Sequence, residues 1–459
     1  DPTGQAGITC LSCHAMESVN STRGNGDYTL GDPPRYPFAH SDSALLTAIN
    51  RQLIRAKPAY HRKTLLKPFH TTAEFCSTCH KTHLPESVNH YRWLRGQNHY
   101  DSFLQSGVSG HRVDSFYYPP QAVERCSVCH MPVQASGDPA ARDFGKTGTR
   151  GIHSHQFPAA NTAIAHMAGL PEEAMTALRA RLADVTRIDI FALKEDGRID
   201  GTVHAPLRPV LPVLEPGRRY LVEVVLRTTG VGHLLTEGTA DSNQLWVEVS
   251  AHSGERLLGH SGAMDLQGRV DPWSYFANSY VLDRHGQRID RRNGQDIFVA
   301  LYNHQIPPGA ASVVHYLLEV PEDLDSPVTL EARLKYRKFD NTYLGYIRDD
   351  EAVCNDLPVT VMATDRVTLP IADGLSLPAS ESPLDVAGRW NDYGIGLLRA
   401  GGGKGELRQA GQAFTEVERA GRGDGALNLA RVYFREGRLA DAVAALSRAG
   451  EGDAPAAPW

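Results

Sequence analysis

The sequence predicts a multidomain protein of three parts: a mainly α-helical and irregular domain over residues 1–184, an all-β sandwich over 185–375 and α-helical repeats over 376–459. Three observations predict this division. The chain has 459 residues, too many for one compact core. Cysteine and histidine concentrate at its start, whereas the apolar pattern beyond them changes to short strand-like runs and then to helical spacing.

The composition excludes several classes of protein. Hydrophobic residues make up 41% of the chain, charged residues 22%, and the formal net charge is -6, which is typical of an ordinary globular protein and not of a disordered one. The acidic balance argues against binding to nucleic-acid phosphates. No run approaches the roughly 20 apolar residues of a membrane span, so no transmembrane segment is predicted.

Six of the seven cysteines fall in a Cys-x-x-Cys-His motif that occurs three times, at residues 10–14, 76–80 and 126–130. A c-type haem is tethered by two thioether bonds, and i, i+3 spacing places the two sulfurs about one helical turn apart. The next residue then brings an imidazole to the iron. The motifs predict three covalently attached haem c groups, with structural zinc as the alternative. The expected haem-binding cysteines are Cys10, Cys13, Cys76, Cys79, Cys126 and Cys129, and the expected proximal ligands are His14, His80 and His130.

The surrounding histidines predict the second axial ligands. Thirteen of the twenty histidines lie within the first 166 residues, so histidine on both sides of each iron can be supplied several times over. Methionine is the competing ligand, but Met16 and Met131 flank their own motifs too closely, which leaves only Met167 in this region. Bis-histidine, low-potential haems that transfer electrons are therefore predicted.

The residues around the motifs resemble those of multihaem c-type cytochromes, especially a bacterial group with a haem segment, a β-rich domain and tetratricopeptide repeats. The likeness lies in residues 7–10, 74–76, 89–111 and 129–132. The third motif is also similar to those of pentahaem nitrite reductases and octahaem hydroxylamine oxidoreductases. This resemblance implies distal ligands at His99, His111 and His155, with His70 as the next candidate and His153 as a competitor of His155.

The resemblance also bears on function. The nitrite reductases look to carry an open haem at a Cys-x-x-Cys-Lys motif, which this sequence lacks. An electron-transfer protein is therefore favoured over an enzyme, and a multihaem oxidoreductase of nitrogen or sulfur compounds with one open haem is the alternative. Because relatives carry further haem motifs upstream, the resemblance implies a fragment or a processed product.

Location and partners follow from the cofactor. Thioether attachment of haem takes place outside the cytoplasmic membrane in bacteria, so a periplasmic or extracellular, cell-surface location is expected. Haem propionates add negative charge and favour basic docking partners. The expected partners are redox proteins, in a larger complex, a filament or a homo-oligomer that forms through the β and repeat domains.

Beyond the motifs, residues 171–182 begin with proline, carry acids in the first turn and are rich in alanine and leucine, which predicts a helix. Residues 330–336 alternate between apolar and charged side chains, which predicts a strand with one buried face. With other apolar runs, this pattern predicts the strands of a sandwich at 187–193, 220–227, 244–249, 296–302, 312–320, 328–336 and 359–362.

Near the C-terminus an apolar pattern recurs with an offset of 32 residues, which resembles a tetratricopeptide repeat; a plain helical hairpin is the alternative. Cys354 has no neighbouring cysteine and is predicted to be a buried small apolar residue. His233 is predicted to be a structural histidine in a loop, with contact to a haem as the alternative. The recurring positions are Ala410, Phe414 and Val417, which correspond to Ala442, Leu446 and Ala449.

Overall fold

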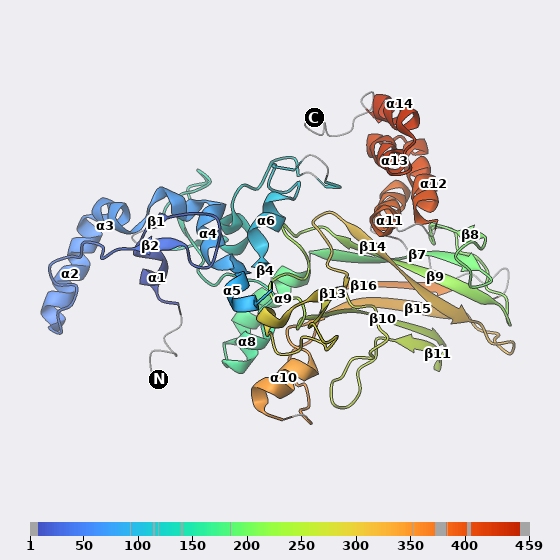
Figure 1. Ribbon diagram of the computed structural model, residues 1–459, viewed down its shortest axis with the longest axis horizontal. Coiled ribbons are helices and arrows are strands. Elements are labelled where there is room, and N and C mark those ends of the chain that lie inside the picture. The colour runs from blue at the N-terminus through green and yellow to red at the C-terminus, as the bar shows by residue number, and fades with distance from the viewer. Residues whose placement is uncertain are drawn as a thin grey trace. The chain divides into compact units, whose positions relative to one another are not determined.

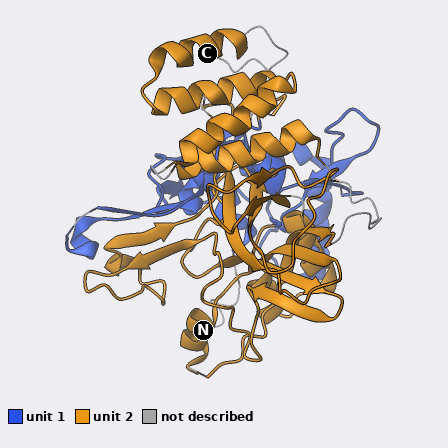
Figure 2. Cartoon of the chain, turned by 90° about the vertical axis from the view of Figure 1, so that its right-hand side faces the viewer, with its two compact units in different colours: residues 1–101, 123–158 blue, residues 102–122, 159–459 orange. Residues whose placement is uncertain are grey.

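The computed structural model describes residues 8–91, 93–112, 115–117, 119–138, 141–183, 185–350, 352–371, 382, 384–401 and 405–449. Its internal contacts divide the chain into two compact units, coloured separately in Figure 2. Unit 1 comprises Asp1–Asp101 and Val123–Pro158, and unit 2 comprises Ser102–Ala122 and Ala159–Trp459. The domain boundaries at 184 and 375 stay predictions.

Unit 1 combines short helices with two-stranded antiparallel hairpins, which pair β1 with β2, β3 with β4 and β5 with β6 (Figure 1). Each cysteine motif lies in a helix that one of these hairpins follows. The elements are α1 (Cys10–His14), β1 (Met16–Val19), β2 (Tyr28–Leu30), α2 (Ala44–Ala56), α3 (Pro58–Leu65), η2 (Pro68–Thr71), α4 (Ala73–His80), β3 (Lys81–Leu84), α5 (Glu86–Asn89), β4 (Leu94–Asn98), α6 (His99–Leu104, which continues into unit 2), α7 (Cys126–His130), β5 (Val133–Ala135) and β6 (Gly151–His153).

The turn of the first hairpin ties the first motif to the second. The backbone N–H groups of Asn25 and Gly26 donate to the carbonyl oxygens of Lys81 (2.9 Å) and Thr78 (2.7 Å). Gly24 has a φ of 85°, and a Cβ atom there would lie 2.0 Å from the Lys81 carbonyl oxygen. Only glycine therefore allows this approach.

Unit 2 contains two four-stranded antiparallel sheets, in the orders β14-β9-β7-β8 and β11-β10-β15-β16, and the two-stranded sheet β12-β13. Each of the seven runs predicted as strands overlaps a strand, but the run at 296–302 becomes extended only from Val299, because Gly294–Asp296 forms a 3₁₀ turn. The elements of this part are α8 (Thr162–Met167), α9 (Glu172–Ala183), β7 (Thr186–Glu195), β8 (Val203–His204), β9 (Arg219–Thr228), β10 (Gln244–Ser253), β11 (Arg256–Ser261), β12 (Ser279–Leu282), η3 (Gly294–Asp296), β13 (Val299–Asn303), β14 (Ala311–Glu319), β15 (Val328–Arg337), α10 (Asn341–Arg348) and β16 (Thr360–Leu369).

The inner faces of the two four-stranded sheets share one apolar core. Ile190 and Val224 of the first sheet and Val247 and Leu334 of the second are completely buried in it. Most of β7 and β9 is buried on both faces, unlike the alternating pattern of β16. The other sheet covers the inner face of β7 and β9, and a helix packs on their outer face.

Four helices, α11 (Val386–Ala400), α12 (Glu406–Arg419), α13 (Gly423–Arg435) and α14 (Leu439–Ala449), follow the sheets, each packed on the one before it (Figure 1). α11 covers the sheet, where Tyr393 stacks on Phe191 with ring centroids 4.5 Å apart. Phe414 is buried, whereas its counterpart Leu446 is 42% exposed. The tetratricopeptide assignment of these helices stays a prediction.

A buried ionic cluster joins α11 to the sheet. The carboxylate of Glu223, which is 0% exposed, accepts hydrogen bonds from Lys194 Nζ (2.9 Å), His315 Nε2 (3.0 Å) and the Tyr393 hydroxyl (2.8 Å). Burial raises the pKa of Glu223, but the hydrogen bonds from His315 and Lys194 outweigh it and hold that pKa below its ordinary value. The carboxylate therefore stays ionised in the core.

The cysteine outside the motifs corrects one prediction. Cys354 is exposed, so its predicted burial is wrong. It lies in an irregular segment whose side chains alternate, with Val353 and Asn355 buried on either side. Cys354 consequently faces outward, where its thiol lies 3.6 Å from the carbonyl oxygen of Leu266.

Candidate functional site

Each Cys-x-x-Cys-His motif ends a short helix, and its histidine is the last helical residue. Residues i and i+3 lie on one face of a helix, so both sulfurs of a motif point the same way. In α4 the two residues between the cysteines, Ser77 and Thr78, are each 1% exposed. Their hydroxyls donate to backbone carbonyls three residues earlier, at 2.7 and 2.8 Å. The hydroxyl groups on the buried side of α4 are thus hydrogen-bonded within the helix, and the cysteines lie on its other side.

The motifs lie close to one another within unit 1. The thiols of Cys76 and Cys126 are hydrogen-bonded, and this contact raises the pKa of Cys76 and lowers that of Cys126. Burial raises the pKa of Cys13, and the neighbouring Cys79 raises it further. The second motif therefore has a cysteine close to each of the other two motifs.

The second hairpin places one histidine opposite another. β3 begins directly after His80, β4 ends directly before His99, and their terminal residues Lys81 and Asn98 are register partners. The chain thereby returns to the end of α4. The rings of His80 and His99 lie 5.3 Å apart between centroids and are nearly perpendicular, at 88°.

Side chains at the base of this hairpin fix His99. The Asn98 side chain accepts a hydrogen bond from the Asp101 backbone N–H at 3.0 Å and donates to its carboxylate at 2.8 Å, which caps the start of α6. Lys81 Nζ binds the same carboxylate at 2.7 Å. Burial raises the pKa of Asp101, but the hydrogen bonds from Lys81 and Asn98 outweigh it and leave that pKa below its ordinary value.

The first motif faces a histidine from the third hairpin. The residues directly after β2 are Gly31 and Asp32, so this hairpin does not end at a histidine as the second one does. The ring of His155, just beyond β6, lies 6.3 Å from the ring of His14. Two imidazoles bound at about 2 Å on opposite sides of one metal ion have ring centres about 6 Å apart. The 6.3 Å between the His14 and His155 rings matches this separation, whereas the 5.3 Å between the His80 and His99 rings is shorter than it.

Backbone carbonyls orient these imidazoles. Nδ1–H of His14 donates to the carbonyl oxygen of Leu65 at 2.8 Å, and that of His155 donates to His153 at 3.0 Å. His130 makes the same contact with Pro158 at 3.1 Å. A carbonyl can only accept, so the proton lies on Nδ1 and Nε2 carries the lone pair that a metal needs.

His70 and His153, two other predicted candidates, bind the backbone. The His70 ring lies 5.2 Å from that of His14, but its Nδ1 accepts from the Lys67 N–H at 2.9 Å and its Nε2 donates to the Cys13 carbonyl at 3.0 Å. In this structure His70 therefore links η2 to the first motif. Nδ1 of His153 donates to the Met131 carbonyl at 2.7 Å, the same kind of contact that His155 makes, so the choice between His153 and His155 stays a prediction.

His111 and His233 belong to unit 2 and not to the unit that carries the motifs. His111 is exposed, and its backbone N–H donates to Ser109 Oγ at 3.3 Å. His233 lies in the loop between β9 and β10, where its Nδ1 hydrogen-bonds the Leu234 carbonyl at 3.1 Å. The distal-ligand role of His111 stays a prediction.

Sequence reasoning missed the residues that hold the ligands in place. These are Asn98 and Asp101 at the helix cap, and the carbonyl groups of Leu65 and Pro158. An Asn-x-x-Asp pattern around a histidine is a capping signal, so the cap could have been found from sequence. The carbonyl partners could not, because any residue type supplies that group.

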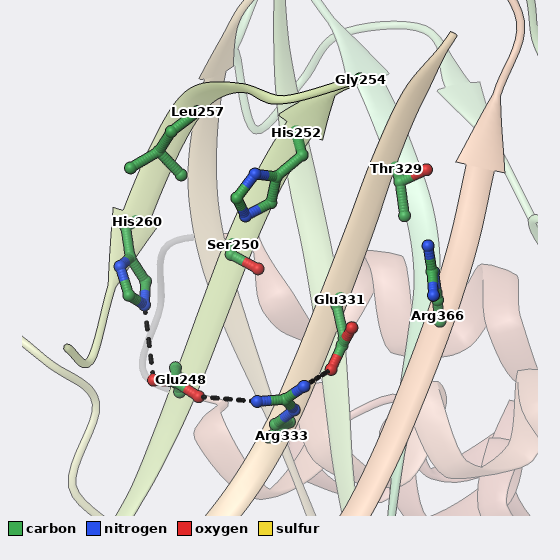
Figure 3. A pocket seen from close by; sticks show the side chains of 10 residues that line it. All are labelled: Glu248, Ser250, His252, Gly254, Leu257, His260, Thr329, Glu331, Arg333 and Arg366. Carbon is green, nitrogen blue, oxygen red and sulfur yellow. Dashed lines mark hydrogen bonds and ion pairs between the residues drawn. The ribbon is translucent and has the colours of Figure 1, made fainter.

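A groove on the outer face of the sheet β11-β10-β15-β16 is a second feature of unit 2 (Figure 3). It has a volume of 540 Å³, and charged side chains line it. Glu248 binds His260 Nε2 at 3.4 Å and Arg333 at 3.7 Å, and Arg333 also pairs with Glu331. These charges largely neutralise one another, so the groove favours no particular ligand charge.

The described residues contain no group of three or more histidine, cysteine or acidic side chains that could hold a metal ion. Within the same residues, no helix has the length and apolar character needed to cross a membrane.

Comparisons with known proteins complete the description. No family model matches this sequence, and no curated protein matches it. Among solved structures, a penta-heme cytochrome c552 from Thermochromatium tepidum matches over 79% of this chain and 77% of that chain, with 15% identity and a TM-score of 0.45. A likeness this distant carries no functional conclusion, so function must be inferred from the residues themselves.

Proposed function

We propose that this chain is a multihaem c-type cytochrome that transfers electrons between closely spaced bis-histidine haems. The second motif carries the proposal. Its two cysteines lie one turn apart on α4, its histidine ends that helix, and a hairpin brings His99 to face His80 at 5.3 Å. A redox dithiol would not need the second imidazole.

The residues fit three attachment sites. Thioether bonds would form at the paired cysteines of α1, α4 and α7, and His14, His80 and His130 would be the proximal ligands. His99 would be the distal partner of His80, and His155 that of His14. The hydrogen bonds from Nδ1 to carbonyl oxygens set the tautomer of His14, His130 and His155, and so aim Nε2 at the metal.

The spacing of the motifs supports electron transfer through the chain. Bound haem c supplies a one-electron redox centre whose potential depends on its axial ligands, burial and hydrogen bonds. The contact between Cys76 and Cys126, together with the proximity of Cys13 to Cys79, would put the second attachment site next to each of the other two. The protein's part would be to keep these centres adjacent.

Location and partners belong to the same proposal. Covalent haem attachment implies the periplasm or the cell surface, and redox proteins that give and take electrons are the expected partners. The helices α11–α14 and the groove of Figure 3 are available surfaces for assembly.

The test begins with covalent attachment. After acid–acetone extraction the denatured chain should keep its red absorbance, and its intact mass should exceed that of the polypeptide by three haems. Substitution of Cys76 and Cys79 by alanine should remove one haem and leave two. Loss of all colour on extraction would refute the proposal.

A second measurement separates a carrier from an enzyme. The reduced protein is mixed with nitrite, hydroxylamine and carbon monoxide, and its oxidation and spectra are followed. A carrier with histidine on both sides of each iron should bind none of them. Rapid turnover of nitrite or hydroxylamine would favour the oxidoreductase with one open haem instead.

A further inference from the structure

The segment α2–α3 of unit 1 is a helical pair with an apolar face that none of the described residues covers. No residue of the 13-residue helix α2 is buried. Leu45 is 70% exposed and Ile49 is 39% exposed. A shallow groove of 370 Å³ runs along this face, lined by Ala48, Ile49, Gln52, Leu53 and Ala56. A helix with leucine and isoleucine on its open side and no buried residue normally has a partner.

The same segment is strongly basic in an acidic protein. Between Ser43 and Ala73 the sequence has six lysines and arginines and neither aspartate nor glutamate, whereas the whole chain has a net charge of -6. Five of these cations are exposed, and no ion pair within the described residues neutralises them. They are Arg51, Arg55, Lys57, Arg62 and Lys63.

The charges and the apolar face occupy different sides of α2. At 100° per residue, Arg51 and Arg55 lie within one narrow sector of the helix. Leu45 and Ile49 are also four residues apart and form another sector, roughly a quarter turn or more away. α3 extends the basic side with Arg62 and Lys63. The segment therefore presents an apolar strip bordered by cations.

An aromatic residue and the hydrogen bond from His14 to the Leu65 carbonyl of α3 link this segment to the rest of unit 1. Tyr36 packs edge-on against Tyr60 of α3, with ring centroids 5.5 Å apart, and its hydroxyl donates to the Lys57 carbonyl at 3.3 Å. Tyr60 itself is 45% exposed. A partly exposed tyrosine beside cations is common in segments that lie at a membrane–water interface.

We propose that α2 and α3 form a docking surface for an anionic lipid bilayer, with the apolar strip of α2 inserted between headgroups and the cations around it bound to lipid phosphates. Amphipathic helices with four to eight basic residues bind anionic lipid in this way. The observations favour a bilayer over an acidic protein because the apolar strip is open along one helix. The cations are also spread over two helices without a pocket that would select one carboxylate.

Docking would bring the unit that carries the three motifs to a membrane surface. The proposal does not depend on the number or ligation of the haems, because it uses only α2, α3 and their charges.

The test uses the full holoprotein and sedimentation with vesicles. Binding is expected to vesicles that contain phosphatidylglycerol and not to phosphatidylcholine alone, and it should weaken as salt is added. Each cation at an anionic surface contributes about a fivefold factor, so R51Q/R55Q should lower the partition constant about 30-fold. The matched control K146Q/R408Q removes two exposed cations elsewhere and should leave binding unchanged.

The apolar strip is tested separately. L45Q/I49Q should lower the partition constant about tenfold at constant charge, whereas L266Q, at a leucine that is 95% exposed in unit 2, should not. An unchanged haem spectrum shows that each variant has folded. No binding of the wild type to anionic vesicles, or equal binding by the variants, would overturn the proposal, and tight binding to an acidic protein alone would assign the surface to that partner instead.

Discussion

The pairing of His99 with His80 predicts what happens when the imidazole opposite one iron is removed. In H99A the second motif keeps both cysteines and His80, so its haem should still attach, but its iron loses the ring that lies 5.3 Å from His80. Because the chain has three motifs, about one third of the iron should change from low spin to high spin. The remaining two thirds should keep their low-spin signals.

The assay is low-temperature electron paramagnetic resonance with spin quantitation on the oxidised protein. H155A should convert a different third of the iron, since His155 faces His14 and not His80. The double variant H99A/H155A should therefore convert about two thirds. H90N is the matched control, because His90 lies between β3 and β4 with a φ of 68°, a conformation that asparagine tolerates. A fully low-spin H99A protein, or a double variant no different from the single ones, would refute the pairing.

Three other substitutions test the supports of the fold. E223Q removes the carboxylate that neutralises the buried ammonium of Lys194 and should lower the free energy of unfolding by about 3 kcal/mol in a urea titration. The control E319Q, at an exposed ion pair, should lower it by less than about 1 kcal/mol. Equal effects of the two variants would contradict the assignment of a buried ion pair. The pKa of Asp101 is lower in the folded protein than its ordinary value of 3.8, so the ionised carboxylate stabilises the fold above pH 3.8 and loses this effect as the pH falls through the folded value. D101N should therefore flatten the fall of the thermal unfolding midpoint below about pH 4. An unchanged pH profile would argue against this role of Asp101. G24A should lower the free energy of unfolding of unit 1 by about 2 kcal/mol, far more than G286A lowers that of unit 2. Both glycines have a positive φ, but of the two only Gly24 has other atoms where a Cβ would stand. Comparable losses in the two variants would mean that the close approach of Gly24 to the Lys81 carbonyl is unimportant.

Short-range patterns predicted the elements of this protein well. The i, i+3 cysteines required a helical turn, and each motif does lie in a helix that ends at its histidine. Strand-like runs overlapped strands, since alternation and β-branched residues act locally. The predicted burial of Cys354 was wrong because it depends on which way an irregular segment faces, and residue type alone does not determine that.

Long-range pairing was not available from the sequence. Thirteen histidines near the motifs gave many combinations, and only strand register selected among them. The register of β3 with β4 puts His99 at the end of α4, whereas the facing of His155 and His14 depends on how two hairpins pack. Both ring nitrogens of His70 bind backbone groups, which spacing could not reveal, and its role as a distal ligand stays a prediction.

The hairpin formed by β3 and β4 also bears on the order in which the sites mature. His80 and His99 are only 19 residues apart in sequence, so their loop closes at small entropic cost. His14 and His155 lie near opposite ends of the sequence of unit 1, so their loop is much longer. We therefore expect the middle site to be complete earliest and to act as the nucleus on which its neighbours assemble.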